Sequence, residues 1–217
     1  MGGGQDRRRA VIFDFDGTIA DSLPAVIAVF EDLTGQPKKF GPKQVNKLRA
    51  LSLPELLVEL KVPKWRVPLL LFRGRRMLRK HLTGIPVHAG MPIMLEMLQA
   101  QGILMYILSS NSTENVREYL RWHKLSQYFS GVYGGASLVG KAPRLLKLIE
   151  KEGLETKNSW YVGDETRDVS AARAVGLHIV SVTWGFNTRK ALAAKKPDAL
   201  ADTAEDLLQI LKDAWKK

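Results

Sequence analysis

The chain has 217 residues, of which 45% are hydrophobic and 25% charged, a composition ordinary for a globular protein with one good core and a smaller insertion. It contains no cysteine, which excludes disulfides and thiolate metal sites, and no apolar run approaches the roughly 18 residues that a membrane-spanning helix needs. The formal net charge is +11, and the whole excess lies between residues 36 and 84, where 13 Lys or Arg accompany only two acids.

The first nine residues end in three arginines and lack the apolar core of a secretory signal. We interpret them as a flexible leader. Because nothing in the sequence points to secretion, we expect a cytoplasmic protein.

The first expected element is a short buried strand at residues 10–13, which is followed by Asp14 and Asp16. Residues two apart on an extended backbone share a face, so both carboxylates can meet one ligand at the carboxyl end of the strand. Gly17, which precedes Thr18, allows a sharp turn in which backbone amides point at an anion. Two carboxylates beside such amides favour Mg2+ held against a phosphate.

This stretch is also compatible with two structures other than a magnesium site. A plain strand-to-turn junction also favours Asp and Gly, so the motif gains weight only from matching residues further along the chain. A calcium loop needs glycine at its sixth position and Glu at its twelfth, but counting from Asp14 these positions hold Ile19 and Ala25. The calcium interpretation is therefore excluded.

Residues 21–85 are expected to form a small all-helical insertion. Ser22 is placed to cap a helix over 23–33, and further helical patterns cover 42–51, 53–60 and 63–81. The last of these joins an apolar run to a strongly basic one, and we favour a helix with a buried apolar face and a solvated basic face. The alternatives are a membrane or nucleic-acid surface, or a positive rim that attracts a phosphorylated substrate.

Strands and helices then alternate to the end of the chain. The expected strands span residues 103–108, 131–133, 159–162 and 177–183, and the expected helices span 93–101, 114–123, 144–151, 169–175 and 203–215. This order predicts an α/β fold whose core is a doubly wound, Rossmann-like parallel sheet. We assign residues 1–20 and 86–217 to this core domain and 21–85 to a helical cap domain. The stretch 184–187, after the last strand, is interpreted as core packing in preference to a part of the site.

Polar residues follow several of these strands. They are Ser109, Ser110 and Asn111 after the second strand, Lys141 in a later loop, and Asp164 and Asp168 after the fourth. Since parallel strands end on one edge of a sheet, we expect these groups to converge with Asp14 and Asp16.

This ordered set resembles the haloacid dehalogenase superfamily, in particular its phosphatases with a small helical cap. The motifs of that family are matched by Asp14-Phe-Asp16-Gly-Thr, Ile107-Leu-Ser109-Ser110-Asn111, Gly140-Lys141 and Val162-Gly163-Asp164-Glu-Thr-Arg-Asp168. The resemblance covers most of the chain after residue 9, although the cap matches only in position and helical character.

The resemblance implies a role for each matched residue. Asp14 would be the nucleophile that forms an aspartyl phosphate, and Asp16 the acid that protonates the leaving oxygen and later the base that activates water. The phosphate would be bound by Ser109, or in its place Ser110, and by Lys141, and Mg2+ would be held by Asp14, Asp164 and the backbone carbonyl of Asp16. Supporting roles would fall to Gly17, Thr18, Asn111 and Asp168, the last serving the metal shell or the orientation of Lys141.

We therefore expect a Mg2+-dependent phosphomonoester hydrolase acting on a small phosphorylated metabolite, with phosphoglycolate as the nearest named substrate. Asp16 favours this chemistry over dehalogenation, because a dehalogenase has no leaving oxygen to protonate. The alternatives are a sugar phosphomutase on the same scaffold and a protein whose basic cap binds nucleic acid or an acidic partner. We expect a monomer or homodimer without a membrane or nucleic-acid partner.

Overall fold

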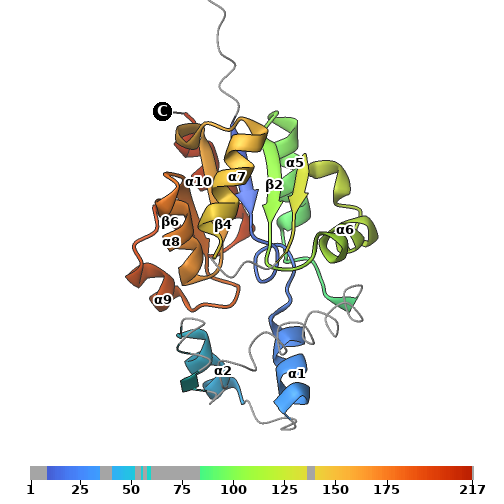
Figure 1. Cartoon of the computed structure of the whole chain (residues 1–217), viewed down its shortest axis with the longest axis vertical. Coiled ribbons are helices and arrows are strands. Elements are labelled where there is room, and N and C mark those ends of the chain that lie inside the picture. Colours follow the sequence, from blue (N-terminus) through green and yellow to red (C-terminus); the bar gives the residue numbers. More distant parts are fainter. Residues whose placement is uncertain are drawn as a thin grey trace, which may run out of the picture.

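The computed structural model describes residues 9–34, 41–51, 55, 58–59, 84–135 and 140–216, and a six-stranded parallel sheet forms its centre (Figure 1). The strands are β1 (Ala10–Phe13), β2 (Leu104–Leu108), β3 (Gly131–Tyr133), β4 (Ser159–Gly163), β5 (His178–Val182) and β6 (Ala199–Ala201). They stand in the order β3-β2-β1-β4-β5-β6, and each neighbouring pair is parallel. The direction of strand addition thus reverses at β1, the switch point beside which such sheets bind ligands. The expected doubly wound α/β fold is confirmed.

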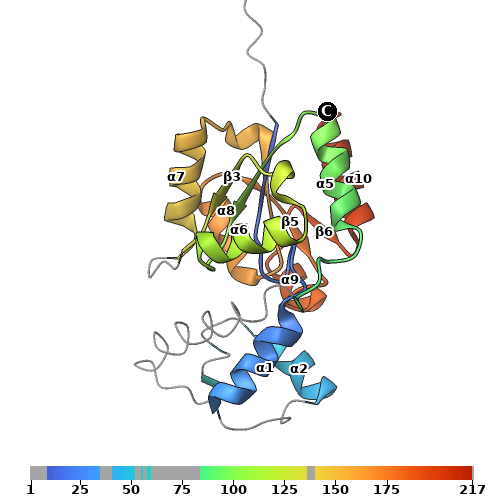
Figure 2. The ribbon, with the colours of Figure 1, turned by 90° about the vertical axis from the view of Figure 1, so that its right-hand side faces the viewer.

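Helices cover both faces of the sheet, as Figure 2 shows for α5 and α10 on one side and α7 and α8 on the other. The first face packs against α5 (Met91–Ala100), α6 (Thr113–Trp122) and α10 (Ala204–Ala214), and the second against α7 (Ala142–Glu152) and α8 (Thr166–Ala174). A six-residue helix, α9 (Arg189–Ala194), lies between β5 and β6. Two short 3-10 turns, η3 (Ser126–Tyr128) and η4 (Thr156–Asn158), precede β3 and β4.

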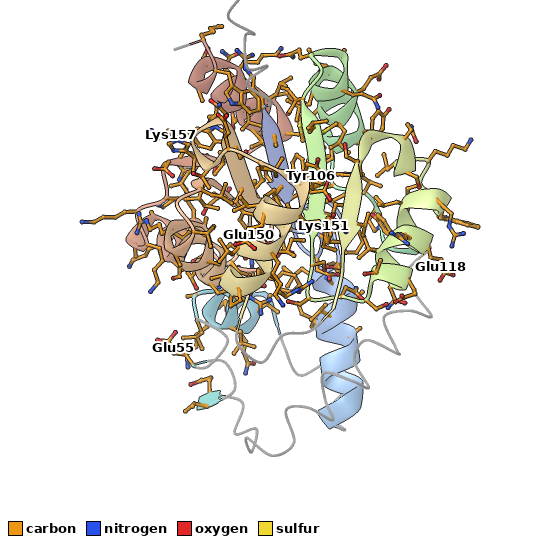
Figure 3. The ribbon with its side chains drawn as sticks, turned by 45° about the horizontal axis from the view of Figure 1, so that its top comes forward. Glu55, Tyr106, Glu118, Glu150, Lys151 and Lys157 are labelled. Carbon is orange, nitrogen blue, oxygen red and sulfur yellow. The ribbon has the colours of Figure 1, made fainter. Side chains whose placement is uncertain are left out.

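The alternation of side chains along the strands produces two apolar clusters. In β1, Val11 and Phe13 belong to the cluster under α5, α6 and α10, whereas Ala10 and Ile12 belong to the cluster under α7 and α8. All four are fully buried, as expected for a central parallel strand covered on both faces. Figure 3 shows Tyr106 of β2 among the packed side chains, while Glu118 and Lys157 lie at the periphery.

The sequence prediction contained neither α9 nor β6. β6 consists of Ala199, Leu200 and Ala201, and alanine has low strand propensity, so nothing local marks it as a strand. α9 is also short, although Thr188 accepts a hydrogen bond from the Ala191 amide as its N-cap. Both elements depend on packing beside β5 rather than on a sequence pattern.

The helices α1 (Leu23–Thr34) and α2 (Pro42–Arg49) lie outside these layers, beyond the carboxyl ends of the strands (Figure 1). The predicted helix over 53–60 is described only at residues 55, 58 and 59, which are helical, and the one over 63–81 falls outside the described residues. Among the helices that the structure describes, none is long and apolar enough to cross a membrane.

Two segments that connect the sheet to the part of the chain carrying α1 and α2 run side by side. Ala20 forms an antiparallel bridge with Val87, the Asp21 amide donates to the Pro86 carbonyl at 2.9 Å, and the His88 amide donates to the Ile19 carbonyl at 2.8 Å. These bonds fix the exit and the return of the chain beside the end of β1.

Candidate functional site

The carboxyl edge of the sheet gathers three buried carboxylates. Asp14 follows β1, Asp164 follows β4 and Asp168 lies in the first turn of α8, and one oxygen of each lies within 4.8 Å of the others. None of the three residues is more than 3% exposed. Residues 150 positions apart in the chain therefore meet, as expected from the parallel arrangement of β1 and β4.

A buried ammonium group lies among these acids. Lys141, at the N-terminus of α7, donates from Nζ to Asp14 Oδ2 at 2.5 Å, to Asp168 Oδ1 at 2.7 Å and to the Tyr161 hydroxyl at 3.2 Å. Burial alone would lower the pKa of Lys141, but the two carboxylates reverse this effect and raise its pKa well above the usual value. Three carboxylates against one ammonium leave two formal negative charges in a buried place, which fits a divalent cation.

Asp14 combines burial with close hydrogen bonding. Its Oδ1 accepts from the Phe15 amide at 2.8 Å, while Oδ2 accepts from Lys141. Burial raises the pKa of Asp14 from 3.8 to about 7, and the Lys141 charge opposes this rise. The carboxylate is thus poorly solvated, and a solvent-deprived anion is a better nucleophile than a hydrated one.

Asp164 is held between two backbone segments. Its Oδ1 accepts from the Thr18 hydroxyl at 2.9 Å, and its Oδ2 accepts from the Phe186 amide at 2.6 Å. Gly17 has φ +78°, and a Cβ on either Gly17 or Gly185 would collide with the Asp164 side chain. Burial, followed by repulsion from Asp14, raises the pKa of Asp164 well above its usual value. A bound cation would relieve both effects.

Asp16 lies beside this cluster without joining its carboxylate oxygens. It is half-buried, and its Oδ2 accepts from Asn111 Nδ2 at 3.3 Å. Burial raises the pKa of Asp16, while the Asn111 hydrogen bond lowers it. Asn111 is itself held by its Oδ1, which accepts from the Ser112 amide and from Asn115 Nδ2. A raised pKa favours the protonated form of the carboxyl, which is the form that a general acid requires.

The two candidate serines differ in their surroundings. Ser109 is buried, and its hydroxyl accepts from the Asn111 amide at 2.9 Å. Ser110 is half-buried and lines a cavity of about 250 Å³ together with Lys141, Arg144, Arg167 and Ser170. Both remain candidates for phosphate binding.

Sequence reasoning missed several residues around Asp164. The interpretation of residues 184–187 as core packing holds for Trp184 but is wrong for Phe186 and Asn187, which hydrogen-bond Asp164 through their backbone amides. Arg49, the last residue of α2, also contacts this stretch. The sequence did contain one signal for these contacts: residues 184–187, Trp-Gly-Phe-Asn, directly follow a strand that ends at the same edge of the sheet.

Comparisons with known proteins identify the family of this chain. The profile of a family described as haloacid dehalogenase-like hydrolase matches residues 11–182. A phosphoglycolate phosphatase of Synechococcus elongatus is 39% identical to this chain over 206 residues, which cover 93% of this chain and 96% of that protein.

Solved structures with the same fold cover almost the whole chain. The crystal structure of a predicted phosphatase from Clostridium acetobutylicum superposes with a TM-score of 0.79 at 20% identity and covers 95% of this chain and 99% of its own. That of a predicted phosphoglycolate phosphatase from Haemophilus somnus gives a TM-score of 0.73 at 23% identity, with 95% and 99% covered. At such identities these two likenesses concern the fold alone.

Proposed function

The chain belongs to the haloacid dehalogenase-like hydrolase family and is a phosphatase, and on this premise we propose that it hydrolyses phosphoglycolate with the help of Mg2+. The observation that carries the proposal is the buried cluster of Asp14, Asp164 and Asp168 around Lys141. The relative that is 39% identical over nearly its whole length is a phosphoglycolate phosphatase, which supports this choice of substrate.

In the proposed reaction Asp14 and Asp16 divide the chemistry. A carboxylate oxygen of Asp14 forms a bond to phosphorus while the bond to the ester oxygen breaks, and Asp16 gives its proton to that leaving oxygen. Glycolate then departs. Asp16, now ionised, takes a proton from a water molecule that attacks the phosphorus, so that inorganic phosphate and free Asp14 are released.

The cation and the lysine would compensate the charge of the phosphoryl group. Asp14, Asp164 and the backbone carbonyl of Asp16 would hold the ion, which when bound offsets the repulsion between the Asp14 carboxylate and the phosphoryl oxygens. Lys141 would bind a phosphoryl oxygen, together with Ser109 or Ser110. Asp168 would orient Lys141, because its Oδ1 accepts from Lys141 and its Oδ2 accepts from the Glu165 amide at 3.0 Å.

We also propose the division of the chain into a core domain, residues 1–20 and 86–217, and a helical cap domain, residues 21–85. A cap beyond the carboxyl ends of the strands can close over a bound substrate and exclude water from the first step. The placement of α1 and α2 on that side of the sheet supports this proposal (Figure 1). The comparisons do not favour a sugar phosphomutase or a nucleic-acid-binding protein.

The test is phosphate release from a panel of phosphorylated metabolites with and without Mg2+. We expect the highest kcat/KM with phosphoglycolate, no turnover in EDTA and recovery when Mg2+ is restored. Full activity in EDTA would contradict the metal assignment. Conversion of a sugar 1-phosphate to its 6-phosphate without phosphate release would instead identify a mutase.

A further inference from the structure

The loop between β5 and α9, residues 183–188, touches both the acidic cluster and the helical insertion. On its sheet side, the Phe186 amide donates to Asp164 Oδ2 at 2.6 Å and the Asn187 amide donates to the Asp164 carbonyl at 3.2 Å. Gly185 lies so close to Asp164 that any side chain there would collide with it. The conformation of this β5–α9 loop therefore fixes the direction of the Asp164 carboxylate.

The other side of the β5–α9 loop binds the end of α2. Arg49, the last residue of α2, donates from Nη2 to the Gly185 carbonyl at 2.7 Å and from Nε to the Phe186 carbonyl at 3.2 Å. Asn187 Nδ2 donates to the carbonyls of Arg49 and Leu51, each at 2.9 Å, and the Thr188 amide donates to the Arg49 carbonyl at 3.1 Å. Five hydrogen bonds thus join the loop to Arg49 and to Leu51, which lies just beyond the end of α2.

One peptide group connects the two sides. The carbonyl of Gly185 and the amide of Phe186 belong to the same peptide unit, which is planar and trans. Arg49 binds its oxygen and Asp164 binds its N–H, so a rotation of this unit would break both hydrogen bonds together. A charged donor on the carbonyl also polarises the peptide and strengthens the hydrogen bond that its N–H makes.

Asn187 links the same contact to the helix that carries Asp168. While its Nδ2 binds the end of α2, its Oδ1 accepts from the amide of Thr166, the first residue of α8, at 2.8 Å. Asn187 is 5% exposed, so its amide group is held on both sides. The docking of α2 thereby affects the two elements that present Asp164 and Asp168.

We propose that Arg49 and Asn187 are positioning residues, and that docking of α2 on the β5–α9 loop orients Asp164 for a divalent cation. The inference rests on the proposed function, because it takes Asp164 as a ligand of the ion. Since coupling between two events is reciprocal, a cation bound at Asp164 also favours the docked position of α2. The helical insertion then takes part in metal binding without offering a ligand.

The test measures binding of Mn2+, which accepts the same oxygen ligands as Mg2+, to the full chain without substrate by electron paramagnetic resonance. Arg49→Met removes both side-chain donors, and we expect about tenfold weaker binding, the lower end of the range for residues that support metal ligands. Arg49→Lys, which keeps one donor group, should recover part of the loss. Asn187→Ala should weaken binding in the same direction.

The matched control is Lys47→Met on the same helix. It removes one positive charge as Arg49→Met does, but Lys47 is 65% exposed at its side chain and pairs with Glu59, so Mn2+ binding should stay unchanged. An equal loss in both variants would attribute the effect to net charge and overturn the proposal. Thermal unfolding of each variant checks that the fold is retained.

Asp164→Asn separates this inference from the proposed function. If it loses Mn2+ binding while Arg49→Met and Asn187→Ala bind Mn2+ normally, the coupling is overturned and the metal site stands. If Asp164→Asn also binds Mn2+ normally, the assignment of the ion to Asp164 is itself wrong, and the inference fails with it.

Discussion

Burial and the charge of Lys141 act in opposite directions on the pKa of Asp14, and a bound cation would stabilise its ionised form. Its pKa is raised from 3.8 to about 7 by burial, although Lys141 lies at 2.5 Å from it. Asp164 is shifted in the same direction by burial and by Asp14. Buried carboxylates of this kind lower the stability of the fold, and groups with such shifted pKa values are common in active sites.

The raised pKa of Asp14 should be visible in the pH dependence of the stability of the metal-free protein. Because the folded-state pKa of Asp14 is about 7 and its ordinary value is 3.8, the folded chain binds more protons than the unfolded chain between these pH values. The free energy of unfolding therefore contains a contribution that decreases as pH rises through this window. We expect the Tm in EDTA, measured by calorimetry, to be higher at pH 5 than at pH 8.

Two comparisons make this measurement specific to the site. Asp14→Asn, which has no proton to lose there, should flatten the dependence, and Mg2+ added at pH 8 should raise the Tm by binding only the folded chain. A Tm that rises from pH 5 to pH 8 equally in the natural chain and in Asp14→Asn would contradict the raised pKa.

Asp14→Asn should also abolish turnover. The amide keeps the size of the side chain but cannot attack phosphorus, and loss of a nucleophile typically costs at least about a thousandfold in kcat. The assay is hydrolysis of p-nitrophenyl phosphate, with Asp213→Asn, on the exposed side of α10, as the control. Activity comparable to that of the control would refute the nucleophile assignment.

At the scale of elements, the turn after β1 depends on a residue without a side chain. Gly17 adopts φ +78°, which disfavours other residues, and a Cβ there would also meet Asp164 and the ring of Phe186. Gly153, the C-cap of α7, has φ +62° with open space around it. A substitution at Gly153 therefore tests backbone strain alone, whereas a substitution at Gly17 adds a collision with Asp164.

We expect Gly153→Ala to lower stability by about 1 kcal/mol and to leave kcat unchanged. Gly17→Ala should lower stability further and reduce kcat/KM strongly, because the added methyl group displaces Asp164. Urea unfolding and steady-state kinetics measure the two effects. An active Gly17→Ala enzyme would show that Asp164 tolerates displacement and would contradict the geometry given for this site.

The sequence predicts the elements that depend on local patterns, but not the contacts between residues far apart in the chain. β1, β2 and β4 appear as apolar runs that end in polar residues, so the sheet and the meeting of Asp14 with Asp164 follow from local patterns and one rule of topology. The contact of Arg49 with Gly185 and Phe186 joins segments 136 and 137 residues apart, and no local pattern indicates it. The choice between Ser109 and Ser110 as the phosphate-binding residue likewise depends on side-chain directions, which sequence spacing does not give.

For the whole molecule, the positive charge is concentrated in one segment of the chain. The excess of positive charge resides in residues 36–84, which form the greater part of the proposed cap. Such a field raises the local concentration of an anionic substrate and is screened over about 8 Å at physiological ionic strength.

We expect the KM for phosphoglycolate to rise with salt concentration at fixed Mg2+, while kcat changes little. Kinetics in a potassium chloride series measure this, with p-nitrophenyl phosphate as the comparison, because it lacks the additional carboxylate of phosphoglycolate. Equal salt dependence for both substrates would show that the basic segment does not act on the second anionic group.

The central place of β1 has a consequence for how the chain is made. β1 is synthesised before both of its neighbours in the sheet, which begin only at Leu104 and Ser159. Until those segments emerge, this fully apolar ribbon has two unpaired edges, which are the surfaces through which nascent chains associate wrongly. Pairing of both edges of β1 therefore has to wait until the segments of β2 and β4 have been made.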